Sequence, residues 1–147
     1  MKVQVISLFA LLSPLTVAID YCAGDESIGR DCDTLTYVDV TTSASSAPKT
    51  SECQDTCRGI LTDAGDWIVD MANKPAGYVQ HMASYPCAFS VTRPPGDTTS
   101  WTASMTNQDM VSILDEVSKR FGSLHGGRVA ANGTMRCTGH TVQWFVD

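Results

Sequence analysis

Six cysteines constrain the fold of this chain more than any other feature of its sequence. They are Cys22, Cys32, Cys53, Cys57, Cys87 and Cys137. In an exported chain, an even number of cysteines predicts that they pair, here as three disulfides. The alternative is a zinc site built on Cys53 and Cys57. His81 or His140 could complete it, but the chain has no paired Cys-x-x-Cys segments of the kind that zinc sites use.

The first 18 residues have the three parts of a secretory signal peptide. Lys2 makes a positive start, the segment 3–12 is mostly apolar, and small residues lead up to Ala18. The apolar run is too short to cross a bilayer, which takes roughly 20 residues. We therefore expect cleavage after Ala18 and a secreted, extracellular product. Residues 19–31 are then an irregular lead-in.

Two amphipathic helices are predicted. The first, 52–63, would open with a capping box made by Ser51 and Gln54. It carries Cys53 and Cys57 on one face with their Cβ atoms parallel, so these two cysteines should bond to different partners. This excludes a Cys53–Cys57 bond and leaves the other pairings open.

The second helix, 108–121, carries Met110, Ile113, Leu114, Val117 and Phe121 on one stripe. Strands are predicted at 35–41, 67–71, 87–92, 128–137 and 141–146, with loops at 72–86 and 93–104. The strand at 128–137 alternates between apolar and polar residues, so one face of its sheet needs a cover of helices. The predicted class is therefore α+β, an α/β sandwich of two helices on a mainly antiparallel, disulfide-stabilised sheet, in one domain over 32–147.

The charge of the chain limits its partners. Removal of Lys2 with the signal peptide leaves nine basic and sixteen acidic residues, a net charge of −7. Binding to nucleic acid or to anionic lipid relies on dense lysine and arginine, which this chain lacks. We expect a monomer with no nucleic-acid partner and no cofactor.

Two predicted loops carry aromatic residues that could contact a partner. One loop holds Tyr78, His81 and Tyr85, and the other holds Trp101. An aromatic side chain on a polar loop can anchor a partner surface. Trp101 could instead fold back over the start of the second helix and be half-buried.

The spacing of the candidate catalytic residues in the sequence does not require them to meet in one site. A ribonuclease-like site could use Glu116 as the acid and Arg136 as a phosphate clamp, with His81 or His140 as the base. The acidic residues of 63–70 could suggest calcium but lack the spacing of an EF-hand loop. We expect neither a catalytic residue nor a metal site.

One modification site is predicted. Asn132-Gly133-Thr134 is an acceptor sequence for N-linked glycosylation in an exported chain. Asn132 lies on the polar face of its predicted strand, so a glycan there would not clash with the core. Whether the site is occupied is left open.

Several segments, in their order and spacing, match a family pattern. They are Asp66-Trp67-Ile68-Val69, Tyr85-Pro86-Cys87-Ala88-Phe89, Asn107-Gln108-Asp109 at a helix start, Lys119-Arg120-Phe121-Gly122, Gly127-Arg128-Val129, Gly133-Thr134-Met135-Arg136-Cys137 and Val142-Gln143-Trp144. Over 31–147 the chain resembles the fungal family described as the "putative necrosis-inducing factor", the homologues of the Cladosporium extracellular-protein-two effector. More distantly, the order of elements resembles small killer toxins, which are α/β sandwiches.

The resemblance implies a disulfide pairing. The family's framework cysteines correspond to Cys32, Cys53, Cys87 and Cys137, and the implied bonds are Cys32–Cys137 and Cys53–Cys87. Cys22 and Cys57 are then left to bond to each other. The resemblance implies no catalytic residues for this chain.

The resemblance also implies a function. The chain would be a secreted fungal effector that promotes host cell death or virulence by binding a host component without catalysis, in the host apoplast if the fungus lives on plants. The alternative is a killer-toxin-like antimicrobial protein that acts on a competitor's membrane or channel. A small secreted hydrolase, such as a ribonuclease, comes third. The partner would be a host or competitor protein or membrane component.

Overall fold

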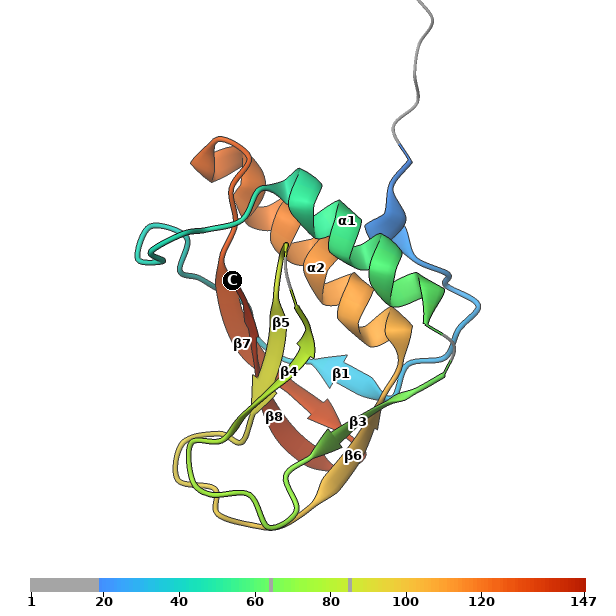
Figure 1. Ribbon diagram of the computed structural model, residues 1–147, viewed down its shortest axis with the longest axis vertical. Helices are drawn as coiled ribbons and strands as arrows, with labels where there is room; N and C mark the ends of the chain where they lie inside the picture. The colour runs from blue at the N-terminus through green and yellow to red at the C-terminus, as the bar shows by residue number, and fades with distance from the viewer. Residues whose placement is uncertain (1–18, 64, 85) are drawn as a thin grey trace, which may run out of the picture.

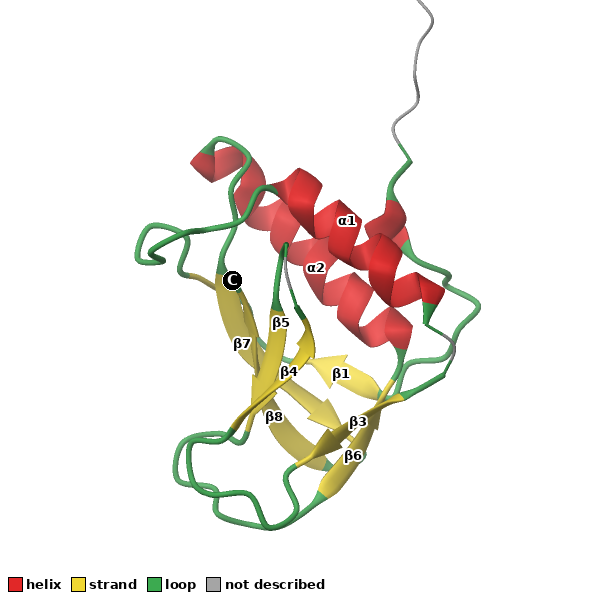
Figure 2. Ribbon diagram, viewed as in Figure 1, coloured by secondary structure: helices red, strands yellow, loops and turns green. Residues whose placement is uncertain are grey.

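The computed structural model describes residues 19–63, 65–84 and 86–147, and in it two helices lie side by side against a sheet (Figures 1 and 2). The helices are α1 (Thr50–Thr62) and α2 (Asn107–Phe121). Short 3-10 turns, η1 (Tyr21–Ala23) and η2 (Gly122–His125), precede α1 and follow α2. The strands are β1 (Cys32–Thr34), β2 (Val38–Asp39), β3 (Trp67–Asp70), β4 (Val79–Ala83), β5 (Phe89–Thr92), β6 (Thr102–Met105), β7 (Ala131–Cys137) and β8 (His140–Val146). The predicted α+β class is confirmed, while the predicted signal peptide falls outside the described residues.

Six strands form one antiparallel sheet in the order β1-β7-β8-β5-β4, with β2 also paired to β7. Its centre is the β7–β8 hairpin, in register from Ala131↔Val146 to Cys137↔His140. The hairpin turns at Thr138 (φ 48°) and Gly139 (φ 87°). Two successive residues with positive φ match the right-handed twist of the flanking strands, which keeps this long pair in register.

The remaining two strands, β3 and β6, form a separate ribbon beside the main sheet. The side chain of Gln80 in β4 connects the ribbon to that sheet. Its amide oxygen accepts from the Asp70 N–H (2.8 Å), and its nitrogen donates to the Ile68 carbonyl (2.8 Å). Gln80 therefore covers part of the free edge of β3, where these two backbone groups would otherwise be unpaired.

The core lies between α2 and the inward face of the sheet. The predicted stripe of α2 faces the core, since Met110, Ile113, Leu114 and Val117 are at most 1% exposed and Phe121 is partly buried. These side chains belong to one apolar cluster with Phe89, Val91, Met135 and Trp144 from the sheet. Burial of each such side chain contributes about 1.5–3 kcal/mol, so the helix stripe is a main source of stability.

Asp109 organises the start of α2. Its carboxylate accepts hydrogen bonds from the backbone N–H groups of Thr106 (2.8 Å), Asp31 (3.1 Å) and Cys32 (3.3 Å). The Thr106 hydroxyl accepts in turn from the Asp109 N–H (3.2 Å) and completes a capping box. One buried side chain thus caps the helix and fixes the entry into β1.

The two residues before Asp109 connect α2 to other segments. Asn107 donates to the Asp63 carbonyl (2.7 Å) after α1 and accepts from the Trp67 indole N–H (2.5 Å) in β3. Gln108 accepts from the Asp25 N–H (2.8 Å) in the lead-in. The Asn-Gln-Asp segment therefore joins the lead-in, α1, β1 and β3 at one point.

Three disulfides hold these elements together. Cys22–Cys57 joins η1 to α1, Cys53–Cys87 joins α1 to the segment before β5, and Cys32–Cys137 joins β1 to β7. This is the pairing that the family resemblance implies, and Cys53 and Cys57 do bond to different partners. Because all six cysteines are bonded, none is free to hold zinc.

The predicted loops 72–86 and 93–104 are wrong in part, because each contains a strand. β4 pairs with β5 across a bulge between His81 and Ala83, and β6 pairs with β3. Both segments are short and rich in polar residues, so their local pattern is that of a loop. Only the neighbouring strands supply the backbone partners that make them extended.

The prediction of one continuous strand over 35–41 is also wrong. The chain forms two shorter strands, and β1 begins at Cys32, before the predicted start. Between them, the N–H groups of Leu35 and Thr36 both donate to the Thr134 carbonyl (2.8 and 3.2 Å). Two residues opposite one make a bulge, which interrupts the strand.

The capping box predicted at Ser51 and Gln54 does not form. α1 begins two residues earlier than that box requires, because Lys49 bridges to Arg128 of the opposite segment, and the Glu52 carboxylate accepts from the Lys49 N–H (2.6 Å). Gln54 instead accepts from the Tyr21 N–H (2.7 Å) and holds the lead-in on the helix. Tertiary pairing of the preceding segment therefore sets the helix start.

We predict that Asp109→Asn lowers the free energy of unfolding by about 1.5–3 kcal/mol, because the amide turns a donor towards N–H groups that need an acceptor. Urea unfolding followed by far-UV circular dichroism measures this change. Asp115→Asn on the same helix is the matched control. Asp115 is partly buried and pairs with the exposed Lys119 (2.6 Å), an i,i+4 pair worth about 0.3–0.5 kcal/mol. Equal effects of the two substitutions would contradict the role assigned to Asp109.

Replacing Cys22 and Cys57 together by serine should lower the free energy of unfolding by about 2–4 kcal/mol, since their bond closes a loop with a sequence separation of 35. Peptide mapping of the unreduced parent protein provides the check on connectivity. It should recover three linked pairs. A free thiol or a Cys53–Cys57 link would overturn the pairing.

Candidate binding surface

The sequence-predicted contact residues Tyr78 and His81 lie at and near the start of β4. The Tyr78 ring is half-buried, with the Lys74 ammonium 5.2 Å from its centroid. His81 is exposed, and its Nδ1 lies 2.9 Å from the Ser90 hydroxyl oxygen in β5. Tyr85 lies outside the described residues. Of the described members of this set, only Tyr78 borders a loop that could contact a partner.

The interpretation of Trp101 as an exposed anchor is wrong. Its side chain is 6% exposed, and the indole stacks on the His140 ring with centroids 4.9 Å apart and planes 10° apart. The Trp101 carbonyl accepts from the Met71 N–H (3.0 Å). The residue does fold back, but onto the β7–β8 hairpin turn and not over the start of α2.

Arg93 joins the two loops that the sequence singled out. We call residues 72–78 and 93–100 the two-loop tip; these are the β3–β4 and β5–β6 loops at the bottom of Figure 1. Arg93 is 7% exposed and donates to the carbonyls of Thr99 (2.7 Å), Lys74 (2.6 Å) and Pro75 (2.7 Å). One buried guanidinium thus holds both loops, and its five fixed donors suit several carbonyls at once. Nothing in the local sequence distinguishes Arg93 from an exposed arginine.

Further hydrogen bonds stiffen the tip. The Asn73 N–H donates to the Ser100 hydroxyl (3.1 Å), from one loop to the other. Asp97 accepts from the hydroxyl (2.6 Å) and backbone N–H (2.8 Å) of Thr99, and these bonds lower the pKa of Asp97, so that it stays ionised. The tip is therefore ordered before any partner arrives.

The exposed surface of the tip is small and polar. Its exposed residues are Asn73, Pro75, Ala76, Gly77, Pro95, Gly96, Thr98, Thr99 and Ser100. Tyr78 and Lys74 border it on one side. Hydroxyl, amide and backbone groups dominate, which is typical of surfaces that form hydrogen bonds to a protein or glycan. The tip has no large exposed apolar side chain with which to enter a bilayer.

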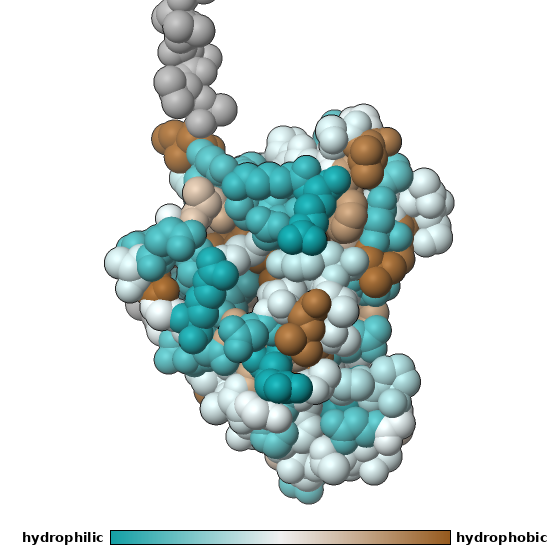
Figure 3. Space-filling view, turned by 180° about the vertical axis from the view of Figure 1, so that it is seen from behind, coloured by the Kyte–Doolittle hydropathy of each residue, from teal (hydrophilic) through white to brown (hydrophobic). Residues whose placement is uncertain are grey.

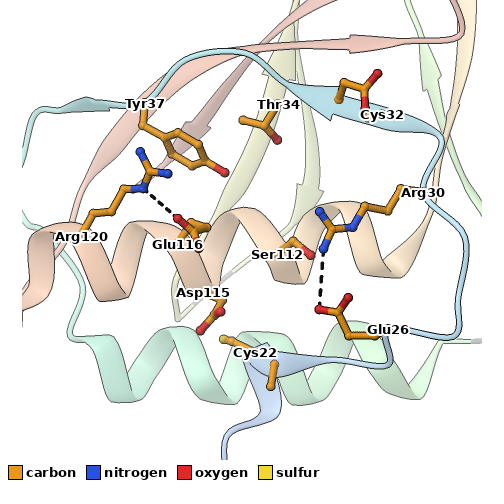
Figure 4. Close-up of a pocket in the computed structure, with 12 residues that line it drawn as sticks. Cys22, Glu26, Arg30, Cys32, Thr34, Tyr37, Ser112, Asp115, Glu116 and Arg120 are labelled. Carbon is orange, nitrogen blue, oxygen red and sulfur yellow. Dashed lines mark hydrogen bonds and ion pairs between the residues drawn. The ribbon is translucent and has the colours of Figure 1, made fainter.

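A hollow of about 460 Å³ lies between the lead-in, β1 and α2, away from the two-loop tip (Figure 4). Its charges are largely paired within it, Arg120 with Glu116 (2.8 Å) and Arg30 with Glu26 (3.8 Å). The Arg120 guanidinium also lies 4.3 Å from the centroid of the Tyr37 ring, and burial raises the pKa of Tyr37. No local pattern in the sequence predicts this hollow, because three separate segments form its walls.

The face of the molecule turned away in Figure 1 is mainly hydrophilic. Its apolar residues form separate small groups among polar ones, and no single apolar patch covers it (Figure 3). Among residues 19–63, 65–84 and 86–147, no helix combines the length and apolarity needed to cross a membrane.

The residues of the ribonuclease hypothesis do not meet. Glu116 lies on α2 over the inward face of the sheet, whereas Arg136 points outward from β7. His81 lies three strands away from β7 in the sheet order, and His140 is stacked on Trp101. The third histidine, His125, pairs with Asp39 (2.6 Å). Within the described part of the chain, no three histidine, cysteine, aspartate or glutamate side chains are grouped to hold a metal ion.

Asn132 lies on the outward face of β7, where the sequence predicts it, and its side chain is partly exposed. It is near the end of the sheet opposite the two-loop tip, because the β7–β8 turn and Trp101 lie at the tip end. The candidate contact surface and the candidate modification site are therefore well separated.

A comparison with protein families finds a match over most of the chain. The family model Hce2, described as "Pathogen effector; putative necrosis-inducing factor", matches residues 31–137. The match runs from the residue before β1 to the last residue of β7. None of the curated proteins compared with the chain matches it.

Arg93→Leu should open the tip, because three loop carbonyls lose their shared donor. We expect a loss of about 1–3 kcal/mol in the free energy of unfolding and faster proteolytic cleavage within 72–78 and 93–100. Limited proteolysis with mass mapping and urea unfolding measure both effects. Arg136→Leu, at an exposed arginine of β7, should change stability by no more than about 0.5 kcal/mol. If the two variants are cleaved alike, Arg93 does not hold the loops.

Proposed function

This chain belongs to the Hce2 family of pathogen effectors, and we propose that it binds a host component through the two-loop tip, without catalysis. The observation that carries the proposal is the buried Arg93, whose three carbonyl contacts hold both loops in one arrangement. A preformed surface loses less conformational entropy on binding, so more of its contact energy becomes affinity. Loops held on a rigid scaffold are also where binding residues concentrate.

The chemistry of the tip indicates the kind of partner. Thr98, Thr99 and Ser100 are exposed, and ionised Asp97 lies beside them. Such groups form directional hydrogen bonds with a partner. At the border of the tip, the ring of Tyr78 adds a flat apolar surface. These features favour the polar surface of a host protein or its glycans over the interior of a lipid bilayer.

Action outside the producing cell is supported by covalent structure and charge. Three disulfides are stable in oxidising, extracellular conditions and are rare in the cytosol. The net charge of −6 favours a dispersed protein that does not adsorb to anionic membranes. Both features suit an effector that diffuses in the fluid between host cells.

Binding without catalysis is the simpler account of the arrangement. The acid, clamp and base of the ribonuclease hypothesis come from different faces and elements of the fold, which favours binding over catalysis. The hollow beside α2 has its arginines paired with glutamates. The enzyme alternative predicts instead that one His→Ala substitution abolishes activity without changing the stability of the protein.

The second candidate is a killer-toxin-like antimicrobial protein. It is favoured by the α/β arrangement of two helices on an antiparallel sheet, which such toxins share. This candidate differs from the effector in its target, since it would act on the membrane or a channel of a competing microbe. The two functions therefore separate in assays on host tissue and on microbial growth.

We predict that pure protein infiltrated into leaf tissue causes necrosis, and that Ala76→Arg with Thr98→Arg raises the dose required at least tenfold. Both residues are exposed on the tip, so large cations there should block a partner without loosening the core. The matched control is Thr42→Arg with Ser45→Arg, in an exposed loop outside the tip, which should keep full activity. Unfolding midpoints of all three proteins verify that each is folded.

The same preparations are applied to growing fungi and bacteria. Growth inhibition without necrosis would favour the killer-toxin-like function and contradict the effector proposal. Necrosis that the tip variant retains in full would show that the partner binds elsewhere on the molecule.

A further inference from the structure

Asn132 lies between two apolar side chains on the outward face of the sheet. In the register of the strands it is opposite Val38 of β2 on one side and Phe145 of β8 on the other. Residues directly opposite each other in antiparallel strands have Cβ atoms roughly 5 Å apart. Val38 is 50% exposed and Phe145 is partly exposed, so both present apolar surface to water beside the asparagine.

We propose that Asn132 carries an N-linked glycan whose first sugar packs between Phe145 and Val38. Asn132-Gly133-Thr134 is the acceptor sequence, and the three disulfides suit a chain that passes through the secretory pathway, where such glycans are added. The amide nitrogen of Asn132 displaces the diphosphate of a lipid-linked oligosaccharide. The nitrogen–C1 bond forms, the C1–oxygen bond breaks, the lipid diphosphate leaves, and a base of the transferase takes the amide proton.

The fold can hold a glycan at this position without disturbance. Side chains of β7 alternate, so Asn132 points outward, Ala131 points into the core, and Gly133 occupies the next inward position. A Cβ on Gly133 would meet the Trp144 ring and the Thr36 carbonyl, so the inward side is completely filled. A sugar on Asn132 extends away from that crowded side and needs no rearrangement.

The flanking residues can hold the first sugar in place by packing against it. The C–H groups on one face of a pyranose ring carry partial positive charge, and the face of an aromatic ring carries partial negative charge. The sugar would cover the exposed apolar surface of Phe145 and Val38. It would leave the two-loop tip free, because Asn132 is six residues from the hairpin turn, roughly 20 Å along the strand.

The folded state also limits when the glycan is added. The Thr134 hydroxyl lies 2.9 Å from that of Thr36, and the Thr36 hydroxyl accepts from the Thr134 N–H (2.9 Å). The transferase needs the third residue of the acceptor free. Transfer must therefore precede the docking of residues 32–39 on β7, which the Cys32–Cys137 bond completes.

The first test is made on protein secreted by a eukaryotic host. Intact mass is measured before and after treatment with peptide N-glycosidase. We expect a loss of mass and an aspartate at position 132 in the parent and in Thr134→Ser, which keeps the acceptor sequence. Asn132→Gln and Thr134→Ala, which remove it in two different ways, should have the mass of the bare peptide. A parent protein with the mass of the bare peptide would overturn the proposal.

The second test addresses the packing of the sugar. Enzymatic removal of the glycan should lower the unfolding midpoint of the parent by roughly 2–4 °C. It should lower that of Phe145→Thr by clearly less, since this variant lacks the ring on which the sugar packs. Equal shifts in the two proteins would overturn the packing between Phe145 and Val38, even with Asn132 glycosylated.

Discussion

The structure depends most on the buried Asn107-Gln108-Asp109 segment at the start of α2. Its three side chains accept or donate hydrogen bonds with the lead-in, the end of α1, the entry to β1 and the first residue of β3. These segments are far apart along the chain, so no local contact sets their arrangement. A buried polar group is expensive when unpaired, so a segment with three of them permits only the arrangement that satisfies all three.

The disulfides reinforce the same arrangement from outside this cluster. Cys22–Cys57 and Cys53–Cys87 attach one face of α1 to the lead-in and to the segment before β5, while Cys32–Cys137 closes β1 on β7. The framework is thus rigid around α2, and the two-loop tip extends from its far end. Arg93 acts at the tip as the Asn107-Gln108-Asp109 segment acts at the start of α2. One buried polar side chain holds two loops that have no apolar core of their own.

Prediction from the sequence succeeded where one element carries its own signal. The stripe of α2 and the alternation of β7 depend only on the spacing of apolar residues, and both were predicted with nearly their observed bounds. β4 and β6 were missed because they are short strands within segments rich in Pro, Gly and polar residues, and pairing with β5 and β3 stabilises them. Trp101 was open to two interpretations for a similar reason, because its burial depends on His140, which lies 39 residues further along the chain.

The sequence by itself determined the class of the fold and the inward and outward faces of β7. It also determined that Cys53 and Cys57 bond to different partners. Each follows from the geometry of a single helix or strand, whose period is set by the backbone. Only the tertiary structure decided where the contact surface lies. Arg93 is an ordinary arginine in the sequence, and it becomes the centre of the two-loop tip because folding brings the carbonyls of Lys74, Pro75 and Thr99 to one point and excludes water from it.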